Sequence, residues 1–592
     1  MHITLKPPVT PTLYLTMNPS APSSPAHSSF GSLMRGGLPR PVLTVEWLIL
    51  LAVSFMLLSG NGPFWRAALA GRDFSRVDSW GFTAALFAIF AGAYCVFALL
   101  LSTRWTVRPL LALLILVTAF ASWYTEHYSA YLDRPMLRNV MQTDFREAAD
   151  LLTWGMVPHL LLKGALPAAL LFWPRLKKTG LSSALTRRLA WLLGSAAIAC
   201  LALWLVFADF ASLMRNHTAL RHLMTPGNAV VALSAEAWSH GKRPKGPKIA
   251  VGEDAHLLPG WSKRSRPVLF VLVVGETARA QNFSLNGYAR QTNPQLAKLD
   301  VLNFSNAKAC GTSTAVSLPC MFSPFGRGAY DEAKILSHES VLNVVQRAGF
   351  KVLWRDNQSG CKGVCDGVPF EQLSRAGIDS ICAEGQCFDE ALLHGMDGIA
   401  RDASGNLFVV LHQMGSHGPA YYKRYPATFK RFKPACENED LRHCTPAEIV
   451  NAYDNSLLYT DDFLSKVIGF LQASEARYDT AMIYLSDHGE SLGENGLYLH
   501  GVPYAIAPDV QTKVPLLAWL SPRFASSFNI DATCLGARSA EALSHDNLFH
   551  SLLGVLDIGT QAYNARLDLF APCRPQPATA ASPAKPPPQT AH

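Results

Sequence analysis

Residues 484–501 read Tyr-Leu-Ser-Asp-His-Gly-Glu-Ser-Leu-Gly-Glu-Asn-Gly-Leu-Tyr-Leu-His-Gly. The apolar run 481–485 leads into this stretch and has the length of a buried strand, and it is followed closely by the adjacent pair Asp487-His488. A carboxylate and an imidazole at the tip of a buried strand are typical of a metal site, whereas an isolated pair is more often a solvated turn. The stretch therefore predicts a metal site if other strand ends supply further ligands.

Strand-like and helical segments alternate through residues 266–573. Helical spacing is clearest over 447–473, and a further helix is expected at about 338–348. Such alternation predicts an α/β domain around a parallel sheet, with its site at the carboxyl ends of the strands. The expected strands are the short apolar runs 268–274, 352–354, 407–411, 481–485 and 514–520.

Two further segments bring matching chemistry to that edge. Glu276 follows the strand 268–274, and the hydroxyl-rich turn 312–314 ends at Thr314. Two carboxylates, an imidazole and a hydroxyl form a donor set that Zn²⁺ accepts, so we expect Glu276, Asp487, His488 and a hydroxyl of this turn to hold the metal. A threonine hydroxyl held against a metal has a lowered pKa and becomes a nucleophile. The alternative for the turn is a plain helix N-cap.

Two more histidines fit the same site. His417 lies just past the strand 407–411, and His500 lies 12 residues after His488. Each could bind a phosphoryl oxygen, hold a second metal ion or protonate a leaving group, and the alternative for each is an ordinary surface histidine.

The first third of the chain has a different character. Only 16% of all residues are charged, against about 25% in ordinary soluble domains. Five apolar runs have the length of a bilayer crossing, which predicts a five-helix transmembrane bundle within 42–211. Basic residues before the first run and in alternate loops place the N-terminus in the cytoplasm and everything after about 212 outside. The runs are 42–60, 80–102, 105–124, 151–173 and 189–211.

The remaining segments are connectors and tails. Residues 1–41 are expected to form a disordered cytoplasmic tail, 212–265 a bridging helix and linker, and 574–592 a disordered tail. Much of the net charge of +8 is explained by the topology-setting loops and by proximity to anionic lipid, so it does not indicate a nucleic-acid partner.

The cysteines agree with an exported domain. Of 12 cysteines, Cys95 and Cys200 fall in predicted spans, and the other ten lie on the predicted outer side, where disulfides form. The connectivity stays open, and zinc binding is an alternative for the pair in Cys361-Lys-Gly-Val-Cys365. Neighbours in sequence suggest the pairs 310–320, 361–365, 382–387, 436–444 and 534–573.

Together these stretches resemble a known family, the lipid A phosphoethanolamine transferases, which include the mobilised colistin resistance enzymes and their chromosomal relatives. The resemblance spans nearly the whole chain. The matching motifs are Gly-Glu276-Thr-Ala-Arg, Cys310-Gly-Thr-Ser-Thr314, Cys361-Lys-Gly-Val-Cys365-Asp, Ser-His417-Gly-Pro-Ala-Tyr-Tyr-Lys-Arg-Tyr-Pro426, Asn451-Ala-Tyr-Asp-Asn455 and Ser-Asp487-His488-Gly-Glu490 through His500-Gly.

The resemblance implies a sulfatase-like, or alkaline-phosphatase-like, periplasmic domain behind a multi-pass anchor in the bacterial inner membrane. It implies Thr314 as the nucleophile, with one tightly bound zinc held by Glu276, Asp487, His488 and Thr314. His417 and His500 would bind the phosphoryl group or a second zinc. Positions matching the substrate-binding residues of the family are Lys362, near the head group, and Asn139, Thr143 and Glu147, for the ethanolamine.

The implied reaction is transfer of phosphoethanolamine from phosphatidylethanolamine to a lipid A phosphate through a phospho-threonine, by a monomer. The product would carry less negative charge and bind polymyxins less. Alternatives are transfer to the lipopolysaccharide core or another glycan, phosphoglycerol transfer, and a non-catalytic lipid sensor. A sulfatase is disfavoured, because no cysteine lies in Cys-x-Pro-x-Arg.

Overall fold

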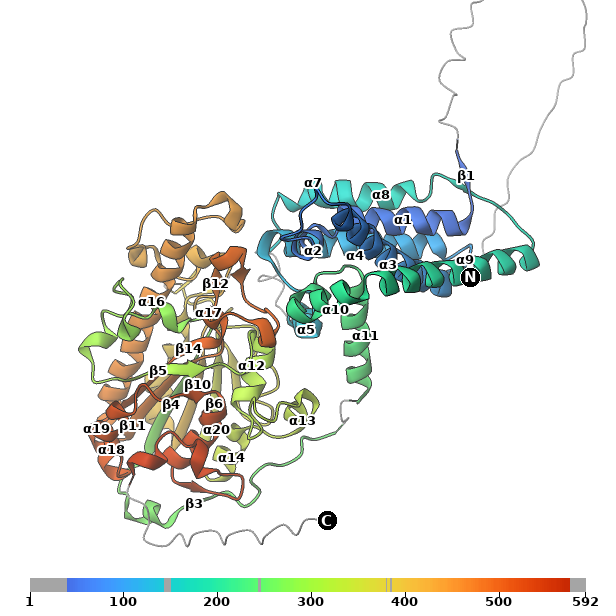
Figure 1. Ribbon diagram of the computed structural model, residues 1–592. Helices are drawn as coiled ribbons and strands as arrows, with labels where there is room; N and C mark the ends of the chain where they lie inside the picture. The colour runs from blue at the N-terminus through green and yellow to red at the C-terminus, as the bar shows by residue number, and fades with distance from the viewer. Residues whose placement is uncertain (1–39, 143–150, 243–245, 380, 384–385, 575–592) are drawn as a thin grey trace, which may run out of the picture.

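The computed structural model describes residues 40–142, 151–242, 246–379, 381–383 and 386–574. Two bodies lie side by side: a bundle of apolar helices, and an α/β domain built around one large sheet (Figure 1). Helix α11 (Gly227–Lys242) descends from the bundle within the predicted bridge and leads toward the α/β domain (Figure 1). The predicted tails lie outside the described residues except for 40–41 and 574.

The bundle contains long apolar helices. Three helices are long and apolar enough to cross a membrane: α3 (Val77–Leu101), α4 (Val107–Tyr128) and α9 (Leu181–Leu205). The pair α1 (Val45–Ser59) and α2 (Gly62–Ala68), bent by 67°, would add a fourth crossing if the two helices form one span. The described part of the chain therefore offers three or up to four spans.

The predicted fourth crossing, 151–173, falls on the shorter apolar helix Met156–Leu170, which comprises α7 (Met156–Leu160), a π-helical turn and α8 (Leu166–Leu170). Five crossings therefore stay a prediction. The short parallel strands β1 (Val42–Leu43) and β2 (Arg175–Leu176) pair with each other. The start of the first predicted span thus lies beside the segment that follows the fourth.

An eight-stranded sheet organises the α/β domain, in the order β15-β5-β14-β11-β4-β10-β6-β7. All five expected strands are present. The expectation of a parallel sheet is wrong at β14, which pairs antiparallel with β11 and β5. The strands are β4 (Val268–Gly275), β5 (Leu302–Lys308), β6 (Lys351–Asp356), β7 (Phe370–Gln372), β10 (Leu407–His412), β11 (Asp479–Ser486), β14 (Lys513–Leu520) and β15 (Leu543–Ser544).

Helices cover both faces of this sheet, so the central strands have no solvated side. Every residue of β4 and β11 is buried, which explains their unbroken apolar runs. One core packs against α16 (Pro446–Ala473) and α15 (Met396–Asp402). The opposite core includes residues of α12 (Thr314–Met321), α14 (Val341–Arg347), α18 (Pro522–Ser527), α19 (Ala532–Ala537) and α20 (Asp546–Val555).

The two expected helices are confirmed. Helix α16 begins where Thr445 and Glu448 form a reciprocal capping box ahead of Pro446, which satisfies amide groups that the first turn leaves unpaired. The helix expected at 338–348 is α14, which begins after a similar box formed by Ser340 and Asn343.

All five suggested disulfides are present: 310–320, 361–365, 382–387, 436–444 and 534–573. Cys361 and Cys365 therefore do not form a zinc site. Cys95 and Cys200 carry no disulfide.

The disulfides should stabilise the domain unequally, because cross-linking a longer loop removes more entropy from the unfolded chain. The chain-entropy relation gives about 4 kcal/mol for Cys534–Cys573 and about 2 kcal/mol for Cys382–Cys387, whose separations are 39 and 5 residues. We expect the double serine variant at 534 and 573 to unfold at a lower temperature than that at 382 and 387. Calorimetry of the detergent-solubilised chain measures this, and equal melting temperatures would contradict it.

Candidate metal and phosphoryl-transfer site

The register of two parallel strands creates the site. Ser486 of β11 lies opposite Gly275 of β4, so the next residues, Asp487 and Glu276, leave the sheet side by side. Both side chains are fully or almost fully buried, as is the adjacent His488. The site therefore forms where the sequence predicts it, at the carboxyl ends of the central strands.

Three of the four predicted ligands come within reach of one ion. Ligand atoms of Glu276, Asp487 and His488 lie within 4.8 Å of one another. His488 Nε2 is 3.5 Å from Glu276 Oε1 and 3.3 Å from Asp487 Oδ2. Within the described ranges, the only other such group contains the disulfide-bonded Cys310 and Cys320, whose sulfurs are not thiolates.

Thr314 completes the predicted set. It is the first residue of α12, immediately after Ser313 in extended conformation, so the helix presents its hydroxyl at its first turn. Thr314 Oγ1 donates to Glu276 Oε2 at 3.1 Å and lies 3.4 Å from His488 Nε2. The turn is therefore both a helix start and part of the site, and the helix N-terminus favours an incoming anion.

The geometry fits a divalent cation. Asp487 Oδ2 is buried and has no hydrogen-bond partner among the described residues. His488 Nδ1 lies 2.9 Å from the Gly489 carbonyl oxygen, which fixes the proton on Nδ1 and leaves the Nε2 lone pair facing the carboxylates. Two carboxylates, a neutral imidazole and a hydroxyl suit Zn²⁺.

Burial dominates the electrostatics of this cluster. Burial, followed by the charge of Asp487, raises the pKa of Glu276, and burial also raises the pKa of Asp487. Burial, followed by His500, lowers the pKa of His488 to about 4. Both shifts favour proton uptake by the carboxylates, and a bound cation would oppose it.

Residues that the sequence did not single out hold the ligands in place. Thr277 has a φ of 61°, which is unusual for a β-branched residue. Its amide donates to Asp487 Oδ1 and its hydroxyl to Glu276 Oε1. The buried Tyr453 hydroxyl donates to the Thr277 carbonyl, and Gln358 Nε2 donates to Glu276 Oε2. Only the Gly-Glu-Thr motif and the Asn451–Asn455 motif hinted at these roles.

His500 lies beside His488, and His417 lies beside His500. The ring of His500 is 4.4 Å from that of His488 and 5.5 Å from that of His417, centre to centre. His500 Nδ1 lies 3.1 Å from Glu490 Oε2, which positions the ring. Burial lowers the pKa of His500 to about 4 and that of His417 well below its usual value. Near pH 7 both imidazoles are neutral, which suits hydrogen bonding or metal binding better than proton donation.

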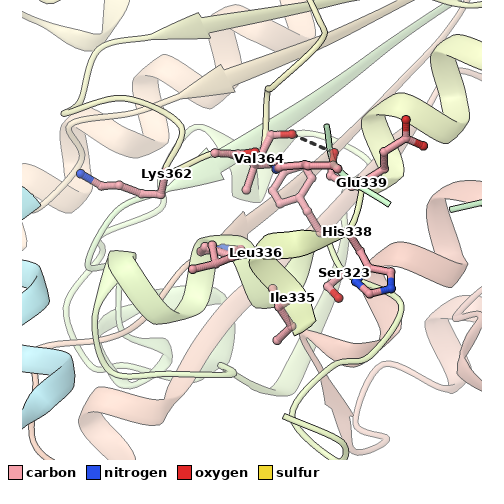
Figure 2. Close-up of a pocket in the computed structure, with 12 residues that line it drawn as sticks. Ser323, Ile335, Leu336, His338, Glu339, Lys362 and Val364 are labelled. Carbon is pink, nitrogen blue, oxygen red and sulfur yellow. Dashed lines mark hydrogen bonds between the residues drawn. The ribbon is translucent and has the colours of Figure 1, made fainter. Parts of the chain in front are cut away.

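Lys362 lies on the loop closed by Cys361 and Cys365. Its ammonium donates to the Ser359 carbonyl and hydroxyl oxygens, at 3.1 and 2.8 Å. Lys362 also lines a small pocket, together with Ser323 and residues of α13 (Glu332–Ser337). Its side chain extends away from the other labelled side chains of this pocket (Figure 2). Asn139 lies on α5 (Arg134–Gln142), whereas Thr143 and Glu147 lie outside the described residues.

Comparison with known proteins agrees with this geometry. Residues 269–558 match the sulfatase family model, and residues 89–238 match the model for phosphoethanolamine transferases EptA/EptB. The chain is 41% identical to phosphoethanolamine transferase EptA of Escherichia coli K12 over 543 residues, covering 91% of this chain and 98% of the relative. This chain belongs to the phosphoethanolamine transferase family. It is an enzyme of that family, with apolar helices ahead of a sulfatase-like domain.

Two further relatives extend the match. Phosphatidylethanolamine transferase Mcr-1 of E. coli is 38% identical over 491 residues, covering 81% of this chain and 89% of the relative. The solved structure of the integral membrane lipooligosaccharide phosphoethanolamine transferase A from Neisseria meningitidis superposes with a TM-score of 0.86 and 35% identity, covering 90% of this chain and 99% of that one. The similarity thus includes both the bundle and the α/β domain.

One glycine should be essential to the metal site. A Cβ at Gly415 would lie 2.5 Å from the Glu276 carbonyl oxygen, so Gly415→Ala should displace Glu276 and weaken Zn²⁺ binding about tenfold or more. Competition titration with a chromophoric zinc chelator measures the change.

Gly405→Ala is the matched control, because Gly405 also has positive φ but a Cβ there would meet nothing within 4 Å. It should cost about 1 kcal/mol of backbone strain and leave zinc affinity unchanged. Equal affinity losses in the two variants would contradict the role given to Gly415.

Proposed function

We propose that this chain transfers phosphoethanolamine from phosphatidylethanolamine to a phosphate of lipid A, in the periplasm at the bacterial inner membrane. Thr314 acts as the nucleophile. The observation that carries the proposal is the contact of the Thr314 hydroxyl with Glu276 and His488 at the mouth of the sheet, in a chain of this family. Relatives of the chain are named as phosphatidylethanolamine or phosphoethanolamine transferases, which supports the transfer reaction. The long apolar helices support a location in the membrane.

In the first step, Thr314 Oγ attacks the phosphorus of phosphatidylethanolamine. The Oγ–P bond forms as the bond between phosphorus and the glycerol oxygen breaks. Glu276, whose Oε2 lies 3.1 Å from Thr314 Oγ1, is placed to take the hydroxyl proton. Diacylglycerol leaves carrying one proton, which balances the proton lost by Thr314.

In the second step, a phosphate oxygen of lipid A attacks the phosphorus of the phospho-threonine. The Oγ–P bond breaks, and Thr314 Oγ takes up the proton that the attacking phosphate hydroxyl loses, with Glu276 placed to pass it on. The neutral ring of His500 lies beside His488 and that of His417 beside His500, where they can donate hydrogen bonds to phosphoryl oxygens or hold a second cation. Lys362 and Asn139, with Thr143 and Glu147, are the proposed contacts of the ethanolamine phosphate head group.

Glu276, Asp487, His488 and Thr314 would hold one Zn²⁺. When bound, the ion stabilises the deprotonated threonine and the charge that develops on the phosphoryl group. The chain's own contribution is to hold two buried carboxylates close together and to fix the imidazole so that its lone pair faces them.

The membrane helices suit two lipid substrates. A membrane-anchored enzyme meets both at one surface, which raises their effective concentration. Each transfer covers an anionic phosphate and adds an ammonium, so the membrane attracts cationic peptides such as polymyxins less strongly. Transfer to a core sugar or another glycan uses the same first step and is the alternative for the acceptor.

The nucleophile is directly testable. Thr314→Ala should abolish phosphorylation of the protein by phosphatidylethanolamine, whereas Thr314→Ser should retain part of it because the hydroxyl stays in place. Peptide mass spectrometry of the metal-loaded protein after incubation with the lipid measures the modification. Phosphorylation of the alanine variant at wild-type level would refute this role, and a lipid sensor would lack the modification altogether.

The acceptor is tested in cells. Expression of the chain should add one or more phosphoethanolamine groups to lipid A, seen as the corresponding mass increase, and polymyxin susceptibility should fall several-fold. The Thr314→Ala variant should give neither effect. Unmodified lipid A with a modified core oligosaccharide would instead assign the acceptor to the core sugars.

A further inference from the structure

Helix α5 (Arg134–Gln142) belongs to the membrane-anchored part of the chain but packs against the catalytic domain. It contacts α11 on one side and α12, the helix that begins at Thr314, on the other. In Figure 1 it lies beneath the bundle, beside α10 (Phe207–Asn216) and α11 and facing the catalytic domain. The helix thus connects the membrane anchor to the nucleophile.

Four charged side chains fix this position. Arg138 Nη2 is 2.7 Å from Glu236 of α11, and Arg134 Nε is 3.0 Å from the same carboxylate. Arg134 Nη2 is 3.1 Å from Glu332 of α13, and Arg138 also pairs with Glu332. Two arginines of one helix therefore share one carboxylate from the bridge and one from the catalytic domain.

The cluster is largely removed from water. The side chains of Arg138 and Glu236 are each 4% exposed and that of Glu332 is 17% exposed, whereas Arg134, at the edge of the cluster, is 36% exposed. Burial alone would raise the pKa of Glu236, but Arg138 and Arg134 lower it to about 2. Removing one partner from such a cluster leaves buried charge uncompensated, so the cluster resists partial opening.

Two paths lead from this cluster to the reacting groups. Glu332 begins α13, whose Ile335 packs with the Cys310–Cys320 disulfide, and this disulfide brackets Thr314 in sequence. Met136 lies on α5 between the two arginines and adjoins Gly501, the residue after His500. The two are so close that a Cβ added at Gly501 would lie 2.5 Å from Met136 Cε. A shift of α5 would therefore disturb both sides of the site.

We infer that Arg134, Arg138, Glu236 and Glu332 form an interdomain latch that positions the donor lipid's head group against Thr314 by holding α5 at the rim of the site. These are positioning residues, because they act through α5 and α13. The inference rests on the proposed function, since the head group in question is phosphoethanolamine on its lipid.

The test uses the full chain in nanodiscs with phosphatidylethanolamine at increasing surface density. Glu332→Gln should raise the donor KM about tenfold or more, with kcat and zinc content changed far less, because misplacing a binding element impairs capture of the donor. Hydrogen exchange of α5 should become faster in the same variant.

Two controls isolate the latch. Glu371→Gln breaks an ion pair with Arg355 inside the catalytic domain, where Nε and Oε2 are 2.8 Å apart, and should leave KM and α5 exchange unchanged. The conservative variant Glu332→Asp keeps a carboxylate facing Arg134 and Arg138, so it should retain much more of the donor affinity than Glu332→Gln.

The outcomes separate the latch from the proposed function. A Glu332→Gln protein that matches Glu371→Gln in KM and exchange overturns the latch, and so does a loss of zinc and kcat without a change in KM. If the wild type transfers nothing and Thr314 is never phosphorylated, the proposed function fails. The exchange measurement then still decides whether the four residues hold α5 in place.

Discussion

Two buried carboxylates at neighbouring strand ends are the constraint on which the structure depends. Parallel pairing of β4 and β11 brings Glu276 and Asp487 together, and no solvent compensates their charges. The desolvation penalty is large unless a cation or a proton joins them. The site accordingly surrounds them with a hydroxyl, an imidazole with its lone pair inward, and amide donors from neighbouring loops.

Part of that arrangement depends on a strained backbone conformation at Thr277. Thr277 has a positive φ, at a cost of roughly 1–2 kcal/mol for a residue with a Cβ. In this conformation the Thr277 amide donates to Asp487 and the Thr277 hydroxyl donates to Glu276. The hydroxyl of Tyr453, a residue of α16, donates to the Thr277 carbonyl oxygen. The layered fold tolerates this strain because the strands and α16 are buried and close-packed around it. The candidate metal site and the stability of the fold are thus linked at one turn.

The sequence predicted what local chemistry determines. The five strands and the five disulfides are confirmed, because apolar runs and, for four of the five pairs, short cysteine spacings are local signals. Glu276, Asp487 and His488 lie together, with the Thr314 hydroxyl in contact with Glu276, but their role as metal ligands stays a prediction. The direction of β14 was wrong, since a strand buried on both faces looks alike in either orientation. Strand β5 was missed because its seven residues are mixed in polarity and only partly buried. Gln358 and the latch depend on contacts between distant segments, which no local pattern encodes.

The position of the anchor follows from the direction of the sheet. Ligands bind at the carboxyl ends of parallel strands, so loops after β11 must face whatever delivers the substrate. Those loops meet the membrane part: Ser129 donates to the Gly496 carbonyl at 2.8 Å, and Met136 adjoins Gly501. On another loop, Arg442 lies over the Trp123 ring at 4.5 Å. The strand direction that brings Glu276 and Asp487 together therefore also turns the site toward the bundle of apolar helices, as the proposed transfer between two lipids requires.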